Sequence, residues 1–171
     1  YIDFEDQNSR DAGKDVAQEV DRLKKEGVQG IVMDVRDNGG GSLKTVVDIA
    51  GLFIEQGPIV QIKSAAGKKE VLYDRDSKIQ WDGPLVVMIN EFSASASEIV
   101  AGAIQDLDRG IIVRQRSYGK GLVQITRPLS YNSQLKVTTA KYYIPCGRCF
   151  QALDFSHSNE DGSVGYMPDS L

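Results

Sequence analysis

The sequence has a single histidine, one tryptophan, two cysteines and five prolines in 171 residues. Any histidine-based catalytic triad would have to use His157, which lies in a polar segment typical of a loop. The two cysteines, Cys146 and Cys149, form a Cys-Gly-Arg-Cys pattern. This spacing is compatible with a strained local disulfide, half of a zinc site or two ordinary thiols. Without a second cysteine pair, we do not expect a bound metal.

Other features are missing as well. The chain has no run of about 18 apolar residues that could span a bilayer, and it does not open with the basic and then apolar segment of a secretory signal. Its net charge is -4, with basic residues interspersed among acidic ones, so we expect neither nucleic acid nor an anionic membrane as a partner. Low-complexity tracts and internal repeats are also absent, which excludes disordered and solenoid classes.

The composition that is present, 41% hydrophobic and 26% charged, is typical of one globular domain. We therefore expect a single domain over residues 1–171. Residues 1–4 resemble the middle of a strand, and the last residues have no terminal character, so we expect the chain to be part of a longer protein.

Apolar periodicity predicts strands that alternate with helices. A helix is expected from a cap at Asn8 or Ser9 to Gly27, and a second one from 43 to 54. The run 30–35 is nearly continuous and β-branched, which predicts a parallel strand buried on both faces. Further strands are expected at 59–64, 70–74, 85–89, 110–113, 122–126 and 135–143, and a further helix is expected at 93–107. Residues after Pro145 are predicted to be irregular, and the whole pattern indicates an α/β fold.

Two strand-to-helix junctions could carry chemistry, because such junctions present unpaired backbone N–H groups and the positive end of a helix dipole. One is the glycine run 39–41, and the other is the segment 93–98, Ser-Ala-Ser-Ala-Ser-Glu. The small side chains of the second junction would let a substrate approach closely. Its serines are candidate nucleophiles, which need a base to take their proton.

Lys120 is the alternative base to His157. It lies between Gly119 and Gly121, where the backbone can approach another segment, and a lysine withdrawn from water can lose its proton near neutral pH. Taken alone, Gly-Lys-Gly in a loop is more often a surface turn than a catalytic loop, and a Ser/Ala-rich helix start is more often a cap with close packing. A phosphate-binding Gly-x-x-x-x-Gly-Lys-Ser/Thr pattern and a Gly-x-Ser-x-Gly elbow are both absent.

Three motifs, however, resemble those of the C-terminal processing (tail-specific) peptidases, in the order and spacing of that family. They are Ser-Ala-Ser-Ala-Ser-Glu-Ile at 93–99, Tyr-Gly-Lys-Gly-Leu-Val-Gln at 118–124 and Asp-Val-Arg-Asp-Asn-Gly-Gly-Gly at 34–41. The resemblance runs from residue 1 to about residue 169. Gly39, where the family usually has proline, and Cys146 depart from the pattern without touching a catalytic role.

The resemblance implies a Ser/Lys serine endopeptidase in which Ser95 is the nucleophile and Lys120 the general base. Gln124 is implied as the residue that orients the lysine amine. The oxyanion hole falls to the backbone N–H groups of Gly41 and Ala96, with Gly40 as the alternative to Gly41. No metal or organic cofactor is implied.

The resemblance also assigns supporting roles. Ser93 and Ser97 would cap or pack, and Asp106, an acidic position that some members need, is expected to be structural. The implied fold is a crotonase-like or ClpP-like spiral of β-β-α units, here without the PDZ domain of the family. Implied substrates are polypeptides with exposed C-terminal tails, in the periplasm or cell envelope.

Two other functions remain open. Relatives of this spiral fold bind apolar molecules without proteolysis, so a binding or scaffolding module is the second reading. An acyl-thioester enzyme of the crotonase class is the third, although the two junctions lack the pair of acidic residues that such chemistry needs.

Overall fold

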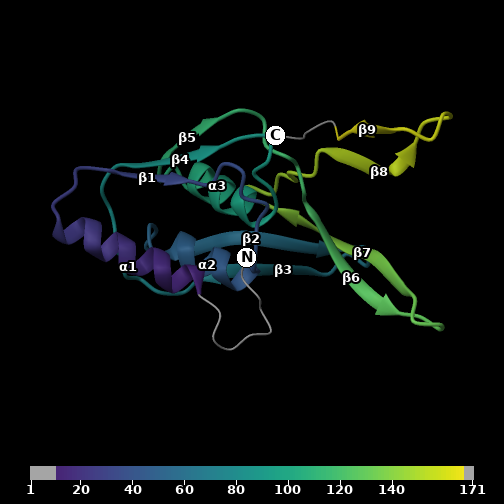
Figure 1. Cartoon of the computed structure of the whole chain (residues 1–171), viewed down its shortest axis with the longest axis horizontal. Helices are drawn as coiled ribbons and strands as arrows, with labels where there is room; N and C mark the ends of the chain where they lie inside the picture. Colours follow the sequence, from purple (N-terminus) through teal and green to yellow (C-terminus); the bar gives the residue numbers. More distant parts are fainter. Residues whose placement is uncertain (1–10, 168–171) are drawn as a thin grey trace.

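A computed structural model describes residues 11–167 of the chain. Its elements, in chain order, are α1 (Ala12–Lys25), β1 (Ile31–Asp34), α2 (Leu43–Gly51), β2 (Gly57–Ser64), β3 (Lys69–Asp74), β4 (Leu85–Ile89), α3 (Ala96–Asp106), β5 (Ile111–Arg114), β6 (Leu122–Pro128), β7 (Gln134–Tyr143), β8 (Leu153–Ser158) and β9 (Val164–Tyr166). Figure 1 shows their arrangement. The expected α/β class is confirmed.

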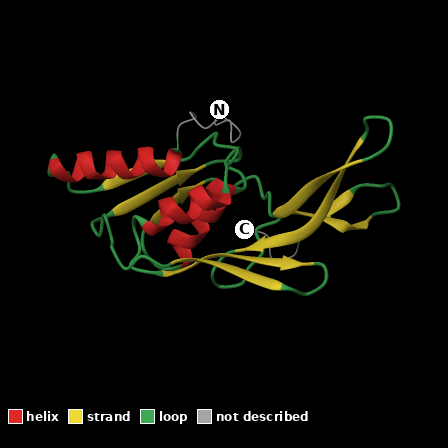
Figure 2. Cartoon of the chain, turned by 90° about the horizontal axis from the view of Figure 1, so that it is seen from below, coloured by secondary structure: helices red, strands yellow, loops and turns green. Residues whose placement is uncertain are grey.

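Two sheets enclose helix α3. The first sheet has the order β1-β4-β5 and is parallel throughout, as the sequence predicted. The second is antiparallel, with the order β3-β2-β7-β6. Helix α3 contacts β4 and β5 of the first sheet and β2 of the second, so it lies between the two (Figure 2). The amino end of α3 therefore faces loops from both sheets.

Two hairpins, β6–β7 and β8–β9, extend from the body of the molecule on the same side (Figures 1 and 2). The β6–β7 hairpin turns at Tyr131 and Asn132, which both have positive φ, and the side chain of Tyr131 is 99% exposed. The β8–β9 hairpin forms its own two-stranded sheet. The sequence predicted irregular structure after Pro145, and this prediction is wrong for residues 153–158 and 164–166.

The core fills the space between the helices and the two sheets. Its largest fully buried side chains include those of Phe53, Phe150, Ile59, Ile99, Ile104 and Ile144. One expectation about burial is wrong, because the outer face of the parallel sheet is open in this chain. Val32 on β1 is 60% exposed, and Ile111 on β5, which shares the cross-strand partner Val86 with it, is 67% exposed. The inner-facing residues Ile31 and Val87 are buried, so β1 is covered on one face only.

Helix boundaries follow their caps. The carboxylate of Asp11 accepts hydrogen bonds from the amides of Gly13 and Lys14, so Asp11 is the N-cap of α1. The predicted caps, Asn8 and Ser9, lie outside the described residues. Gly27 follows the C-cap residue of α1 and has a φ of 73°. This left-handed conformation is typical of a glycine that ends a helix, as the sequence predicted. Ser42 caps α2, which ends at Gly51 rather than at residue 54.

Candidate active site

Ser95 lies at the sharp turn between the loop after β4 and helix α3. It is the N-cap residue of α3, with φ 56° and ψ -111°, a conformation that a non-glycine residue rarely adopts. Such strain is typical of functional positions, and strand-to-helix turns that expose a nucleophile are a recurring case. The side chain of Ser95 is half-buried. The turn thus presents its hydroxyl at the amino end of a buried helix.

The hydroxyl groups of the two flanking serines are occupied. Ser93 donates to the carbonyl of Val35 at 2.8 Å, and Ser97 donates to the carbonyl of Asn38 at 3.0 Å. The amide of Ala94 also donates to Asn38, at 3.0 Å. These bonds fasten the loop after β1 to the start of α3, as the packing role predicted for Ser93 and Ser97 requires. The Ser95 hydroxyl, by contrast, donates no hydrogen bond to any residue in the range 11–167.

The glycine-rich loop after β1 packs directly against this turn. A Cβ added to Gly40 would lie 2.8 Å from the Ser95 Cβ, 2.7 Å from the Ala94 carbonyl oxygen and 2.8 Å from the Ala96 nitrogen. Gly40 also has a φ of 100°, which favours glycine. Only a residue without a side chain fits here, so the glycine brings the loop backbone against the candidate nucleophile.

The backbone donors predicted for an oxyanion hole line one cavity. Gly41 and Ala96 both border a cavity of about 970 Å³, whose walls include the apolar side chains of Met33, Val35, Val46, Ile49 and Val100. The amide of Gly40 is occupied, because it donates to the side-chain oxygen of Asn38 at 2.9 Å. Neither the Gly41 nor the Ala96 amide donates a hydrogen bond to another described residue. This pattern favours Gly41 over Gly40 as the first donor.

The lysine loop, residues 115–121, lies beside the Ser95 turn because the Glu98 side chain accepts hydrogen bonds from both. One carboxylate oxygen of Glu98, Oε2, accepts from the amide of Ser95 at 2.8 Å and from the amide of Lys120 at 2.9 Å. The other oxygen, Oε1, accepts from the hydroxyl of Ser117 at 2.7 Å and the amide of Gly119 at 2.6 Å. Because the backbone nitrogens of Ser95 and Lys120 bond to the same oxygen atom, the distance between them cannot exceed the sum of these two hydrogen-bond lengths.

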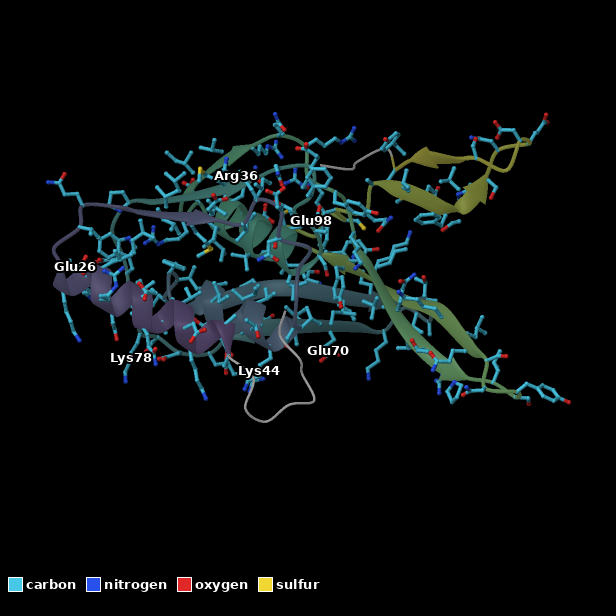
Figure 3. The ribbon with its side chains drawn as sticks, viewed as in Figure 1. Glu26, Arg36, Lys44, Glu70, Lys78 and Glu98 are labelled. Atoms are coloured by element: carbon cyan, nitrogen blue, oxygen red, sulfur yellow. The ribbon has the colours of Figure 1, made fainter. Side chains whose placement is uncertain are left out.

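Glu98 is 3% exposed and lies at the amino end of α3, where Figure 3 labels it. Sequence reasoning assigned it no role. The signal was present, because Ser95-Ala96-Ser97-Glu98 matches the Ser-x-x-Glu pattern of a capping box, in which the glutamate reaches back to the N-cap amide. That pattern predicts the bond to Ser95, but it does not predict the three bonds to the lysine loop.

A second segment supports the lysine loop from the opposite side. The amide of Gly121 donates to the side-chain oxygen of Gln151 at 2.8 Å, and the amide of Ala152 donates to the carbonyl of Gly119 at 3.0 Å. A Cβ on Gly119 would lie 2.3 Å from that of Ala152, and Gly119 has a φ of 81°. The two glycines around Lys120 are thus required by close packing, and the surface-turn reading of this loop does not describe it.

The predicted contact between Lys120 and Gln124 is not formed among the described residues. The Lys120 side chain is exposed, and the Gln124 amide Nε2 donates to the hydroxyl of Thr138 at 3.3 Å. The orienting role of Gln124 therefore stays a prediction. Gln124 lies on β6, four residues after Lys120, so the two side chains extend from adjoining parts of one loop and strand.

The remaining polar candidates lie elsewhere. His157 is on β8, and its Nδ1 contacts the Asp154 carboxylate at 2.8 Å. This contact lowers the pKa of Asp154 through the hydrogen bond from His157. Asp106, near the end of α3, accepts from the amide of Cys146 at 2.8 Å, which is the structural role expected of it. Cys146 and Cys149 are free thiols.

An ion pair fixes the start of the glycine-rich loop. Arg36, labelled in Figure 3, donates to both oxygens of Asp34, at 2.9 Å from Nε and 2.7 Å from Nη2. Side-chain and backbone hydrogen bonds from Arg36 lower the pKa of Asp34 to about 2. Asn90 adds a further bond, because its side-chain oxygen accepts from the amide of Asp37 at 3.0 Å.

Within residues 11–167, no group of three or more histidine, cysteine, aspartate or glutamate side chains is placed to hold a metal ion. Among the helices of the same range, none combines the length and the apolar character needed to cross a bilayer.

Comparisons with known proteins agree with this geometry. The sequence pattern of peptidase family S41 matches residues 1–156. A carboxyl-terminal-processing protease of Synechocystis sp. is 40% identical over 165 residues, which are 96% of this chain and 36% of that protein. A tail-specific protease of Haemophilus influenzae is 45% identical over 118 residues, 69% of this chain and 17% of that protein.

The same relationship holds in three dimensions. A photosystem II D1 C-terminal processing protease of known structure superposes with a TM-score of 0.76 and 33% identity. The match covers 94% of this chain and 39% of that one. The chain thus spans less than half the length of each of these relatives.

Proposed function

This chain belongs to peptidase family S41, and from that membership we propose that it holds the catalytic core of a serine endopeptidase. In this proposal Ser95 is the nucleophile, Lys120 is the general base, and the amides of Gly41 and Ala96 form the oxyanion hole. The substrates are polypeptides cleaved at or near exposed C-terminal tails, and the protein acts in the periplasm or cell envelope.

The observation that carries this proposal is the shared acceptor Oε2 of Glu98. A single oxygen atom accepts from the backbone amides of Ser95 and Lys120, and the closeness of the two backbones supports a Ser/Lys pair. Both residues lie on short segments packed by glycines. A lysine is able to serve as base in its neutral form, as in other serine hydrolases without histidine.

The chemistry follows from these positions. The Ser95 oxygen attacks the scissile carbonyl carbon while the neutral amine of Lys120 takes the hydroxyl proton. The carbonyl oxygen becomes an oxyanion that accepts from the Gly41 and Ala96 amides, helped by the positive end of the α3 dipole. The C–N bond then breaks, and Lys120 gives its proton to the leaving amine. Water then attacks the resulting ester carbon while Lys120 takes its proton, and Lys120 returns that proton to the Ser95 oxygen as the ester C–O bond breaks.

The apolar cavity beside Gly41 and Ala96 is placed to receive a substrate side chain next to the reacting carbonyl. In this proposal Gln124 holds the lysine amine after a side-chain rearrangement, since apo arrangements are often looser than those with substrate bound. A rotation of the Gln124 side chain away from Thr138 would be needed for this contact.

The test uses the full protein with an unstructured polypeptide that has a free C-terminus. Ser95→Ala and Lys120→Ala should each lower kcat at least about 1000-fold, with circular dichroism spectra like that of the unchanged protein. Mass spectrometry of the products locates the cleavage sites. If the unchanged protein binds such polypeptides but leaves them intact, the proposal fails and the binding-module reading takes its place.

A further inference from the structure

Glu98 makes more contacts than a helix cap needs. A capping glutamate satisfies the amide of its own N-cap residue, here that of Ser95. The other three donors, from Ser117, Gly119 and Lys120, lie 19 to 22 residues further along the chain. A carboxylate is an acceptor-only group with two oxygens, and each oxygen of Glu98 receives two donors. The side chain is fully used, and each of its partners belongs to the candidate catalytic loops.

The Ser95 turn is not in a relaxed conformation by itself. Ser95 has a φ of 56°, and strained backbone persists only where surrounding contacts over-determine it. Glu98 supplies one such contact to Ser95, and it also accepts from the amides of Gly119 and Lys120. Because Glu98 is buried within rigid helix α3, its carboxylate is a fixed reference point, and the two loops are held relative to it.

We propose that Glu98 is a positioning residue that sets the separation between Ser95 and Lys120 and thereby the rate of proton transfer from serine to lysine. This inference rests on the proposed Ser/Lys function. Glu98 touches the backbone of the two residues, not the substrate, so its contribution acts on the chemical step. A displacement of about 1 Å between reacting groups can reduce a rate about 100-fold.

Glutamine is the sharpest substitution because it keeps the shape of the side chain. In Glu98→Gln, an NH2 group replaces one oxygen and meets at least one backbone N–H that it cannot accept from, whichever way the amide is turned. Ser117→Ala is milder, since it removes one donor to Oε1 and leaves both bonds to Oε2. The kcat of Ser117→Ala should therefore lie within about tenfold of that of the unchanged protein. The kcat of Glu98→Gln should be lower than that of the unchanged protein by about 100-fold.

A matched control separates positioning from general stability. Val20 is 3% exposed and lies on α1, and Val20→Ala should lower the melting temperature without changing kcat in the folded protein. The readouts are kcat and KM with a polypeptide substrate, and the rate of labelling of Ser95 by a fluorophosphonate. In Glu98→Gln, kcat and labelling should fall in the same ratio while KM changes less than about threefold, because the substrate site is untouched.

A second measurement does not depend on activity. Amide hydrogen exchange should become faster at Ser95, Gly119 and Lys120 in Glu98→Gln, and should stay unchanged there in Val20→Ala. A Glu98→Gln protein with normal kcat and labelling would overturn the inference. If the unchanged protein neither hydrolyses nor labels, the proposed function fails, and the exchange data decide whether Glu98 joins the two loops: slow exchange retained at all three amides would refute that link as well.

Discussion

Gly40 provides the most direct test of the contact between the glycine-rich loop and the Ser95 turn. In Gly40→Ala, the new methyl group would meet three atoms at 2.7–2.8 Å, two of them backbone atoms of Ala94 and Ala96. Backbone atoms at the start of a buried helix cannot move aside as a side-chain end can. The loop must therefore withdraw from Ser95, and it takes the Gly41 amide with it.

The size of the effect has two parts. A non-glycine residue at a φ of 100° costs about 1–3 kcal/mol, and overpacking costs about another 1–3 kcal/mol. The free energy of unfolding should thus fall by about 2–6 kcal/mol, or roughly 5–20 °C in melting temperature for a domain of this size. Loss of one aligned oxyanion donor should lower kcat by a further factor of about 100 to 1000 in the protein that still folds.

Gly39 offers the matched control, since it is adjacent and no atom lies within 4 Å of an added Cβ. Gly39→Ala should change the free energy of unfolding by less than about 1 kcal/mol and leave hydrolysis within about threefold. Melting curves and peptide hydrolysis well below the melting temperature measure both quantities. Equal activity and equal melting temperature for the two variants would refute the packing of Gly40 against Ser95.

Three further predictions concern the two serines beside Ser95, His157 and Asp34. Ser93→Ala leaves the Val35 carbonyl with only the amide of Asn38, 3.4 Å away, and removes the acceptor of the Asn90 amide, so it should lower the free energy of unfolding by about 1–3 kcal/mol. Ser97→Ala should cost about 1 kcal/mol. Both variants should keep kcat, and loss of kcat in either, with activity kept in Ser95→Ala, would show that another serine is the nucleophile. His157→Ala should leave the rate and the pH profile of hydrolysis unchanged, and loss of hydrolysis in this variant would make histidine the base. The pKa of Asp34 is lowered to about 2, so its pairing stabilises the folded state above about pH 4 and is lost as the pH falls toward 2; Asp34→Asn should therefore lose less melting temperature between pH 5 and pH 2 than the unchanged protein, and equal losses would contradict this linkage.

Local signals predicted much of the fold. Continuous β-branched runs such as residues 85–89 identified the parallel strands, and glycines such as Gly27 marked helix ends. The β8–β9 hairpin was missed because Phe155 and Tyr166 are largely exposed, so these strands pair with each other and leave no strong apolar pattern. The open outer face at Val32 could not be foreseen either, because a β-branched run carries the same signal whether one face or both are covered.

The candidate site was predicted through motifs, and only in part. Ser95 and Lys120 stand out by type and by their small neighbours, and the structure brings their backbones together. The role of Glu98, which bonds to both backbones, was not predicted. A glutamate in the first turn of a helix is common, and tertiary structure determines which distant residues it contacts. Similarly, no local pattern indicated that Gln151 and Ala152 would support the lysine loop.

That support has a consequence for the order of synthesis. Segments 35–41 and 93–98 are made before Lys120, but the loop around the lysine is enclosed only when Gln151 and Ala152 reach Gly121 and Gly119. Chains are made from the amino end at about 5–20 residues per second. A nascent chain that has passed Lys120 but not yet reached residue 152 contains the candidate nucleophile and base, yet lacks the segment that supports the lysine loop. Assembly of the candidate site is thereby delayed until this segment has been translated, so under the proposed function unfinished chains would be poorly equipped to cut their neighbours.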